Sequence, residues 1–192
     1  MKVFGDSNNK FLKRYILLYE IIVTKRGLKM IGLISDTHDN VSNIIKAVEI
    51  FKEKGVEFVL HLGDVVAPSS IKYFKGIDMR FIKGNCDGDV ETLKKKIDEI
   101  NGKFYNVLKK LKYKDKVFML FHGKPEEELD EMINRQAYDY VIHGHTHNKR
   151  DDKFENTRVI NPGAHYTAPD QKEHTIAILD VEKDKLEFIE VK

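Results

Sequence analysis

The chain has 192 residues, of which 41% are hydrophobic and 33% are charged. This length and composition are typical of one folded domain with a sizeable core, and they exclude a disordered chain. The formal net charge is +2, but residues 1–29 carry seven Lys or Arg against two acidic residues, a local +5 that leaves −3 for the remainder. The mildly acidic body excludes a broad basic surface, so we expect no nucleic-acid polymer as a partner.

The cysteine count and the apolar runs set the expected compartment. Cys86 is the single cysteine, which excludes an internal disulfide and indicates a reducing, cytoplasmic environment. The best apolar stretch, residues 15–23, contains Glu20 and is far shorter than the roughly 20 residues that a spanning helix needs. We therefore expect no membrane partner and no secretory signal.

Residues 1–29 differ from the rest of the chain. Phe11, Tyr15, Leu18 and Ile22 lie at helical spacing, which favours an amphipathic helix that docks on the protein or on a membrane surface. Met30 stands directly before the first apolar run, which favours instead an added or mis-assigned leader. We divide the chain into an N-terminal extension, 1–29, and a single domain, 30–192.

From Met30 to residue 100, short apolar runs alternate with helical patterns. Strands are predicted over 30–35, 57–62 and 79–82. Helices are predicted over 41–54 with a stop at Gly55, in a short segment after Pro68, and over 90–100 with Asp89 as the cap. Strands separated by helices indicate a parallel sheet built from right-handed crossovers.

The second half of the chain has a different pattern. We expect neighbouring strands over 107–111 and 117–121, a helix over 125–137, and a strand over 138–142. Antiparallel strands should follow over 157–160, 175–181 and 186–191. Lys183-Asp184 is predicted as a hairpin turn, and Gly163 is predicted to supply positive φ in a tight turn.

Side chains that bind metals follow five of the predicted strands. The segments are Asp36-Thr37-His38, Gly63-Asp64, Gly84-Asn85-Cys86-Asp87, His122-Gly123 and His143-Gly144-His145-Thr146-His147. Sites in open α/β sheets form beyond the carboxyl ends of strands, so these segments should meet at one rim. Imidazole, carboxylate and amide ligands without thiolate favour Mn²⁺, Fe, Co²⁺, Ni²⁺ or Zn²⁺.

Local chemistry also suggests how such ligands would act together. Asp64 lies after Gly63, which lets the backbone approach closely, and suits a carboxylate that bridges two cations. The pairs Asp36/His38 and His145/His147 would each point the same way if the backbone stays extended.

Taken alone, each segment has an ordinary alternative. Residues 36–40 are more often a helix cap, Gly63-Asp64 and Gly84-Asn85 are common turns, and a lone His122 is usually a surface histidine. Five such segments in order after predicted strands favour a metal site.

With these motifs, residues 30–192 resemble the calcineurin-like metallophosphoesterase superfamily, and most closely its small single-domain prokaryotic phosphodiesterases. The resemblance implies an α/β fold arranged as a four-layer α/β/β/α sandwich with two divalent metal ions, Mn²⁺ first among them. It also implies the ligands. One ion would be bound by Asp36, His38, Asp64 and His147, and the other by Asp64, Asn85, His122 and His145.

The resemblance implies in-line attack on phosphorus by a metal-bridging hydroxide. We hypothesise catalytic roles for Asp64, Asn85, Cys86 and His143, with His165 as a further candidate donor. Many family members have histidine where this chain has Cys86, so the proton donor is left open. Val65-Val66-Ala67-Pro68 departs from the Asp-Arg-Gly segment of the protein phosphatases, which argues against that specificity.

We expect a small phosphodiester substrate, with nucleotides among the candidates. The alternative from another class is a catalytically weak scaffold or binding module of the same fold, because a retromer subunit shares it. A DNA nuclease is a second alternative, disfavoured by length and charge. A homodimer is left open.

Overall fold

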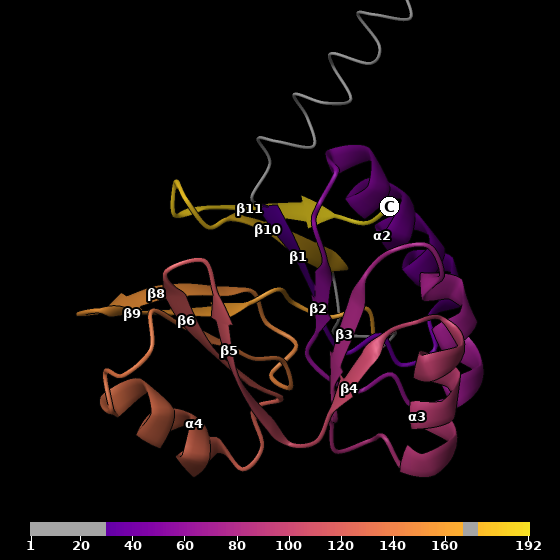
Figure 1. Ribbon diagram of the computed structural model, residues 1–192, viewed down its shortest axis with the longest axis horizontal. Helices are drawn as coiled ribbons and strands as arrows, with labels where there is room; N and C mark the ends of the chain where they lie inside the picture. The colour runs from indigo at the N-terminus through magenta and orange to yellow at the C-terminus, as the bar shows by residue number, and fades with distance from the viewer. Residues whose placement is uncertain (1–29, 167–172) are drawn as a thin grey trace, which may run out of the picture.

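The computed structural model describes residues 30–166 and 173–192. Two β-sheets stack face to face, and helices cover the outer side of each (Figure 1). This confirms the predicted four-layer α/β/β/α arrangement. Residues 1–29 and 167–172 lie outside the described residues, so the predicted N-terminal helix and most of the loop after His165 are not tested here.

The first sheet has six strands, and its centre is parallel. Their order is β11 (Lys185–Glu190), β10 (Thr175–Asp180), β1 (Met30–Ile34), β2 (Val59–His61), β3 (Met79–Ile82) and β4 (Lys103–Tyr105). Strands β1 to β4 run parallel, whereas β10 is antiparallel to both β1 and β11. Three helical segments cover its outer face, namely α2 (Val41–Lys54), the 3₁₀ helix η1 (Pro68–Phe74) and α3 (Val90–Glu99).

The second sheet has five strands and one covering helix. Its order is β5 (Leu108–Tyr113), β6 (Lys116–Phe121), β7 (Tyr140–Ile142), β9 (Thr157–Asn161) and β8 (Arg150–Phe154). Strands β5 and β6 form a hairpin, and β6, β7 and β9 run parallel. Helix α4 (Glu126–Asn134) packs on the outer face.

The apolar pattern of the strands explains the layers. Because side chains alternate across a strand, Ile31 and Leu33 of β1 point between the sheets, whereas Ile34 points toward the helices. Phe118 and Leu120 of β6 meet them from the second sheet. The core between the sheets is therefore one continuous apolar cluster with residues from both sheets.

The predicted helix signals are largely confirmed. Asn40 caps α2 by accepting a hydrogen bond from the Asn43 N–H at 3.2 Å, and Gly55 ends it with φ of 65°. Asp89 caps α3 through the Thr92 N–H. Gly163 has φ of 90°, as its predicted turn requires. Among the described residues, no helix is long and apolar enough to cross a bilayer.

Three strand predictions need correction. Strands β4 and β8 were not expected, because β4 has only three residues and β8 is made of mostly exposed, charged residues without apolar alternation. Residues 157–160 were expected to be purely antiparallel, but β9 runs parallel to β7 and antiparallel only to β8. Strand β8, between β7 and β9 in the sequence, reverses the direction of the chain. Because β8 has little apolar alternation, the sequence did not predict that reversal.

Candidate metal centre

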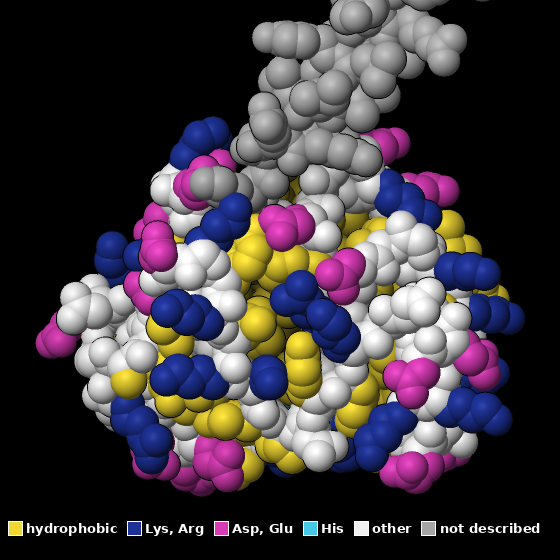
Figure 2. All heavy atoms as spheres, viewed as in Figure 1, with side chains coloured by type: hydrophobic (Ala, Val, Ile, Leu, Met, Phe, Trp, Pro, Cys, Tyr) yellow, Lys and Arg dark blue, Asp and Glu magenta, His cyan; other side chains and the backbone are white. Residues whose placement is uncertain are grey.

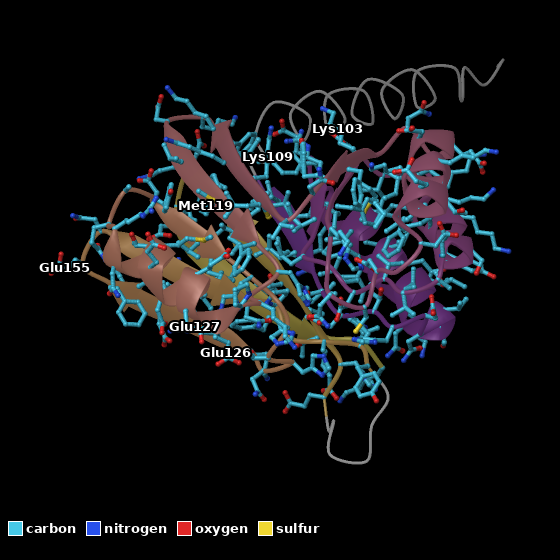
Figure 3. All side chains as sticks on the ribbon, turned by 90° about the horizontal axis from the view of Figure 1, so that it is seen from below. Lys103, Lys109, Met119, Glu126, Glu127 and Glu155 are labelled. Carbon is cyan, nitrogen blue, oxygen red and sulfur yellow. The ribbon has the colours of Figure 1, made fainter. Side chains whose placement is uncertain are left out.

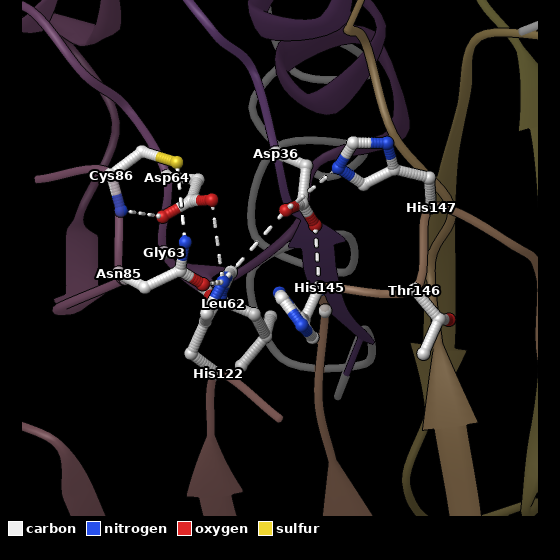
Figure 4. Close-up of polar contacts among 12 residues, drawn as sticks. Asp36, Leu62, Gly63, Asp64, Asn85, Cys86, His122, His145, Thr146 and His147 are labelled. Carbon is white, nitrogen blue, oxygen red and sulfur yellow. Dashed lines mark hydrogen bonds and ion pairs between the residues drawn. The ribbon is translucent and has the colours of Figure 1, made fainter. Parts of the chain in front are cut away.

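The five predicted segments meet at one edge of the two sheets (Figure 4). Asp36, Asp64 and Asn85 follow β1, β2 and β3 of the first sheet. His122 and His145 follow β6 and β7 of the second sheet. The site therefore lies where the carboxyl ends of parallel strands from both sheets face each other, as α/β architecture favours.

One group of ligand atoms gathers around Asp36. The Nε2 atom of His147 lies 3.4 Å from Asp36 Oδ1, and His38 Nε2 lies 3.6 Å from Asp64 Oδ2. The potential ligand atoms of Asp36, His38 and His147 all lie within 4.8 Å of one another. These distances suit several atoms that share one cation.

A second group gathers around His122, which contacts the same Asp64 oxygen as His38. His122 Nε2 lies 3.4 Å from Asp64 Oδ2 and 3.0 Å from Asn85 Oδ1. The ring of His145 packs edge-on against that of His122, with centroids 5.2 Å apart. Asp64 Oδ2 is thus shared by His38 and His122, and His122 Nε2 also lies 4.0 Å from Asp36 Oδ1. The structure brings together all seven residues predicted as ligands.

The local backbone differs from the predicted one. Asp36, His38 and His145 have φ of 50°, 40° and 67°, so the Asp36/His38 and His145/His147 pairs are not extended. Left-handed conformations cost of order 1–3 kcal/mol for residues other than glycine. Hydrogen bonds between loops compensate, since the Asp36 N–H donates to the Gly63 carbonyl and the His145 N–H donates to Asp36 Oδ2, each at 3.0 Å.

Close approach of these loops requires glycine at two positions. A Cβ on Gly84 would lie 2.0 Å from Asp64 Oδ1, and a Cβ on Gly144 would lie 1.9 Å from Ser35 Oγ and 2.7 Å from Asp36 Oδ2. Gly63 has φ of 101° and packs under the His122 ring, which confirms the predicted close approach before Asp64.

Two carboxylates that were not assigned a role hold the loops in place. Asp87 is buried and accepts hydrogen bonds from the N–H groups of Asp64, Val66 and Gly84 at 2.7–3.2 Å. Asp39 accepts from the Ala67 N–H and, at 2.6 Å, from the Ser70 hydroxyl. Both lie inside the quoted motifs, but only the fold reveals that each ties one strand-end loop to the next.

The hydrogen bonds of His122 leave its outer nitrogen free to bind a cation. Nδ1 lies 2.7 Å from the Leu62 carbonyl oxygen, which can only accept, so Nδ1 carries the proton. In neutral His122 the Nε2 lone pair then points at the oxygens of Asn85 and Asp64. Burial lowers the pKa of His122, but the Asp64 and Asp36 carboxylates outweigh it and raise that pKa, which favours a proton on Nε2. A metal ion would take the place of that proton, and the Leu62 carbonyl orients the ring for it.

The charge balance also fits a cation. Asp36 and Asp64 are almost fully buried, and no described Lys or Arg forms an ion pair with either. Asp36 Oδ1 and His38 Nε2 are buried without a hydrogen-bond partner. Burial raises the pKa of Asp64, but the His122 imidazole and the Cys86 N–H outweigh it and hold that pKa well below its usual range. Buried carboxylates of this kind need positive charge nearby.

Two other histidines, His143 and His165, are buried next to the site. Burial lowers the pKa of His143 to about 4 and that of His165 to about 4, so both are neutral near pH 7. His143 donates from Nδ1 to the Gly144 carbonyl at 3.0 Å, and the His165 N–H donates to the Asp36 carbonyl. These contacts give both residues a supporting position, while the proton-donor role of His143 stays a prediction.

Cys86 and Tyr166 lie on the open side of the site. The Cys86 N–H donates to Asp64 Oδ1 at 2.8 Å, and its thiol accepts from the Asn85 amide. Tyr166, which the sequence did not single out, has its ring centroid 4.6 Å from that of His38 and 5.3 Å from that of His147. It is 39% exposed. No motif marks this tyrosine, because its place depends on the loop after Gly163.

Fold and site together define a metal-dependent phosphoesterase. The calcineurin-like phosphoesterase superfamily domain matches residues 30–184. The chain belongs to the calcineurin-like phosphoesterase superfamily, which confirms the resemblance drawn from the motifs and makes the protein a metal-dependent hydrolase of phosphate esters.

Individual relatives agree with this assignment. A phosphodiesterase of Methanocaldococcus jannaschii is 38% identical over 161 residues, which cover 80% of this chain and 93% of the relative. A probable metallophosphoesterase of Methanothermobacter thermautotrophicus is 28% identical over 82% of this chain and 89% of the relative. The solved structure of an archaeal phosphodiesterase superposes with a TM-score of 0.78 at 36% identity, over 84% of this chain and 99% of that one.

Proposed function

We propose that the protein hydrolyses small phosphodiesters, nucleotides among them, at a centre of two divalent metal ions. The supporting observation is that Asp64 Oδ2 lies 3.6 Å from His38 Nε2 and 3.4 Å from His122 Nε2, so that one carboxylate meets a histidine of each predicted ligand set. One ion would be held by Asp36, His38, Asp64 and His147, and the other by Asp64, Asn85, His122 and His145. Bound divalent ions, Mn²⁺ foremost, would activate water and neutralise charge on the phosphoryl oxygens.

Other residues of the chain hold the metal ligands in position. Asp87 and Asp39 fix the loops that present Asp64 and Asp36, so the ligands are organised before substrate arrives. The Leu62 carbonyl sets the His122 tautomer. The exposed ring of Tyr166 offers a flat apolar face beside the site, on which a nucleobase or another aromatic leaving group can stack.

The site is poorly equipped to protonate the leaving group. Cys86 stands on the open side, and a thiol is a poorer match to this task than an imidazole with a pKa near 7. We therefore propose that substrates with good leaving groups are favoured, because they need little proton donation.

Hydrolysis of bis(p-nitrophenyl) phosphate with Mn²⁺ tests the assignment. Asp64→Ala and Asn85→Ala should abolish metal-dependent turnover, whereas Cys86→Ser should change it by less than about tenfold. An inactive Cys86→Ser enzyme beside an active Asp64→Ala enzyme would overturn the assignment. A panel of cyclic nucleotides, linear dinucleotides and monoesters with several metals would then identify the substrate class.

Metal uptake separates this proposal from the scaffold alternative. Equilibrium dialysis of the metal-free protein at micromolar Mn²⁺ should recover about two ions per chain. Failure to bind any Mn²⁺ would favour a binding module of the same fold over an enzyme.

A further inference from the structure

The outer face of the second sheet is only partly covered by α4. Helix α4 packs on β6, β7 and β9 through Leu129, Met132 and Ile133. The edge strand β5 lies beyond it, and its register with β6 places Leu108, Lys110 and Lys112 on the same face as Met119 and Phe121. These three β5 residues are exposed, and Leu108 is exposed by 43%.

A groove of about 230 Å³ runs between α4 and β5. Its lining is apolar in the middle and charged along α4, and the residues are Leu108, Met119, Met132, Tyr138, Glu128, Glu131 and Arg135. Val107, next to it, is 48% exposed. Figure 2 shows the front face, where apolar surface is interleaved with basic side chains, and Figure 3 labels Met119 on β6 and Glu126 and Glu127 at the start of α4.

The two rims of this groove carry opposite charges that the chain neutralises only in part, through the ion pair between Glu131 and Arg135 on α4. Lys110 and Lys112 of β5 face the groove side, whereas α4 begins with Glu126, Glu127 and Glu128. Within the described ranges, Lys110, Lys112 and Glu128 form no ion pair, although lysines such as Lys54 and Lys96 do. The Lys110 ammonium instead lies 6.0 Å from the centre of the Tyr138 ring, above the groove.

We propose that this surface is the interface of a two-fold homodimer. A two-fold axis would set the β5 rim of one copy against the α4 rim of the other, so that Lys110 and Lys112 face Glu128 twice. Such a surface is self-complementary, which an isologous interface requires. Leu108 and Val107, the exposed apolar side chains here, would form its apolar centre inside a charged rim, the usual anatomy of an interface.

The competing explanation is that the lysines protect the edge strand β5 from pairing with strands of other chains. Charged residues on an edge strand discourage pairing with other chains, and acidic residues in the first turn favour a helix. Neither effect explains an exposed leucine and valine beside an apolar groove between the charged rims. The two explanations differ in one measurable respect, which is whether the protein self-associates through opposite charges.

Charge reversal tests the interface without use of enzymatic activity. By analytical ultracentrifugation at low salt, the wild-type chain should be a dimer. Lys110→Glu/Lys112→Glu makes both rims negative, and Glu128→Lys/Glu131→Lys makes both positive, so each should weaken the dimer about tenfold or more. Lys72→Glu/Lys95→Glu, which alters exposed lysines on the helices of the first sheet, should leave it unchanged.

Mixing the two reversed variants gives the decisive result. A negative-rim copy and a positive-rim copy restore both sets of opposite charges, so the mixture should form a heterodimer although neither variant dimerises alone. Added salt should weaken both the wild-type dimer and the heterodimer. A monomeric wild-type protein at about 100 μM and low salt overturns the proposal, as does a dimer that neither reversal weakens. Circular dichroism confirms that each variant is folded.

Discussion

At the scale of single residues, the site depends on how closely loops can approach the two carboxylates. Asp36 and Asp64 are buried against backbone, and glycines stand where any side chain would collide with them. Metal ligands are sensitive to such packing, since partners outside the ligand set commonly change affinity by 10–100-fold. Gly144 and Gly88 allow a matched comparison, because both are glycines in loops but only one is crowded.

Gly144→Ala should weaken Mn²⁺ binding by at least about tenfold. The new methyl group would overlap Ser35 Oγ at 1.9 Å and press on Asp36 Oδ2 at 2.7 Å, which displaces that carboxylate from His147. Isothermal titration with Mn²⁺ measures the change. Gly88→Ala is the control, because its added Cβ would meet no atom within 4 Å. Equal affinities for both variants would contradict the packing argument.

At the scale of elements, the strand-end loops are held to one another rather than to their own strands. Asp87 in the loop after β3 accepts hydrogen bonds from backbone N–H groups of the loop after β2. Asp39 in the loop after β1 accepts one from the N–H of Ala67, which lies in that same loop after β2. The ligands of one ion therefore come from separate segments whose relative position depends on a few buried hydrogen bonds.

Asp87→Ala should lower the free energy of unfolding by about 3 kcal/mol or more. The change leaves the N–H groups of Asp64, Val66 and Gly84 without their acceptor, and hydrogen bonds to charged groups contribute roughly 1.5–3 kcal/mol each. Urea denaturation of the metal-free protein provides the measurement. Asp89→Ala, which removes an exposed helix cap, should cost only about 1 kcal/mol. If the two losses were the same, Asp87 would not tie the loops together.

At the scale of the whole molecule, a buried histidine links the two central loops and makes stability depend on pH. His61 accepts a hydrogen bond from the Gly63 N–H at Nδ1, so its Nε2–H donates to the Thr37 hydroxyl at 3.1 Å. Burial lowers the pKa of His61 to about 3, with Phe81 stacked on its ring. Only the neutral imidazole can make both bonds.

Acid should therefore destabilise the protein before its carboxylates titrate. The unfolded chain binds a proton at His61 near pH 6.5 whereas the folded chain does not, so stability is complete above pH 6.5 and falls as pH drops toward 3. From pH 7 to 5, His61 alone should cost about 2 kcal/mol. Urea denaturation of metal-free wild type and His61→Phe at both pH values checks this. Between pH 7 and 5, the free energy of unfolding of His61→Phe should fall by about 2 kcal/mol less than that of the wild type. An equal fall in both proteins would refute the assignment of His61 as neutral in the folded state.

Metal should also stabilise the whole fold, because it relieves repulsion between Asp36 and Asp64. Ligands that bind only the folded state add about 2.7 kcal/mol at a hundred times their dissociation constant. Mn²⁺ at that excess should raise the melting temperature of the wild type, and a chelator should reverse the rise. Asp64→Ala should show little response in the same thermal scan. A rise of equal size in Asp64→Ala would place the bound metal elsewhere.

The sequence by itself determined the strand-end ligands and the parallel centre of the first sheet. Apolar runs such as 30–35 and the chemistry of Asp36, Asp64 and His145 are local properties that a chain carries without its fold. Tertiary structure alone decided the left-handed loops, the ties made by Asp87, the parallel pairing of β9 and the place of Tyr166. Each of these depends on contacts between residues distant in sequence, whose free energy exists only once the two sheets have packed.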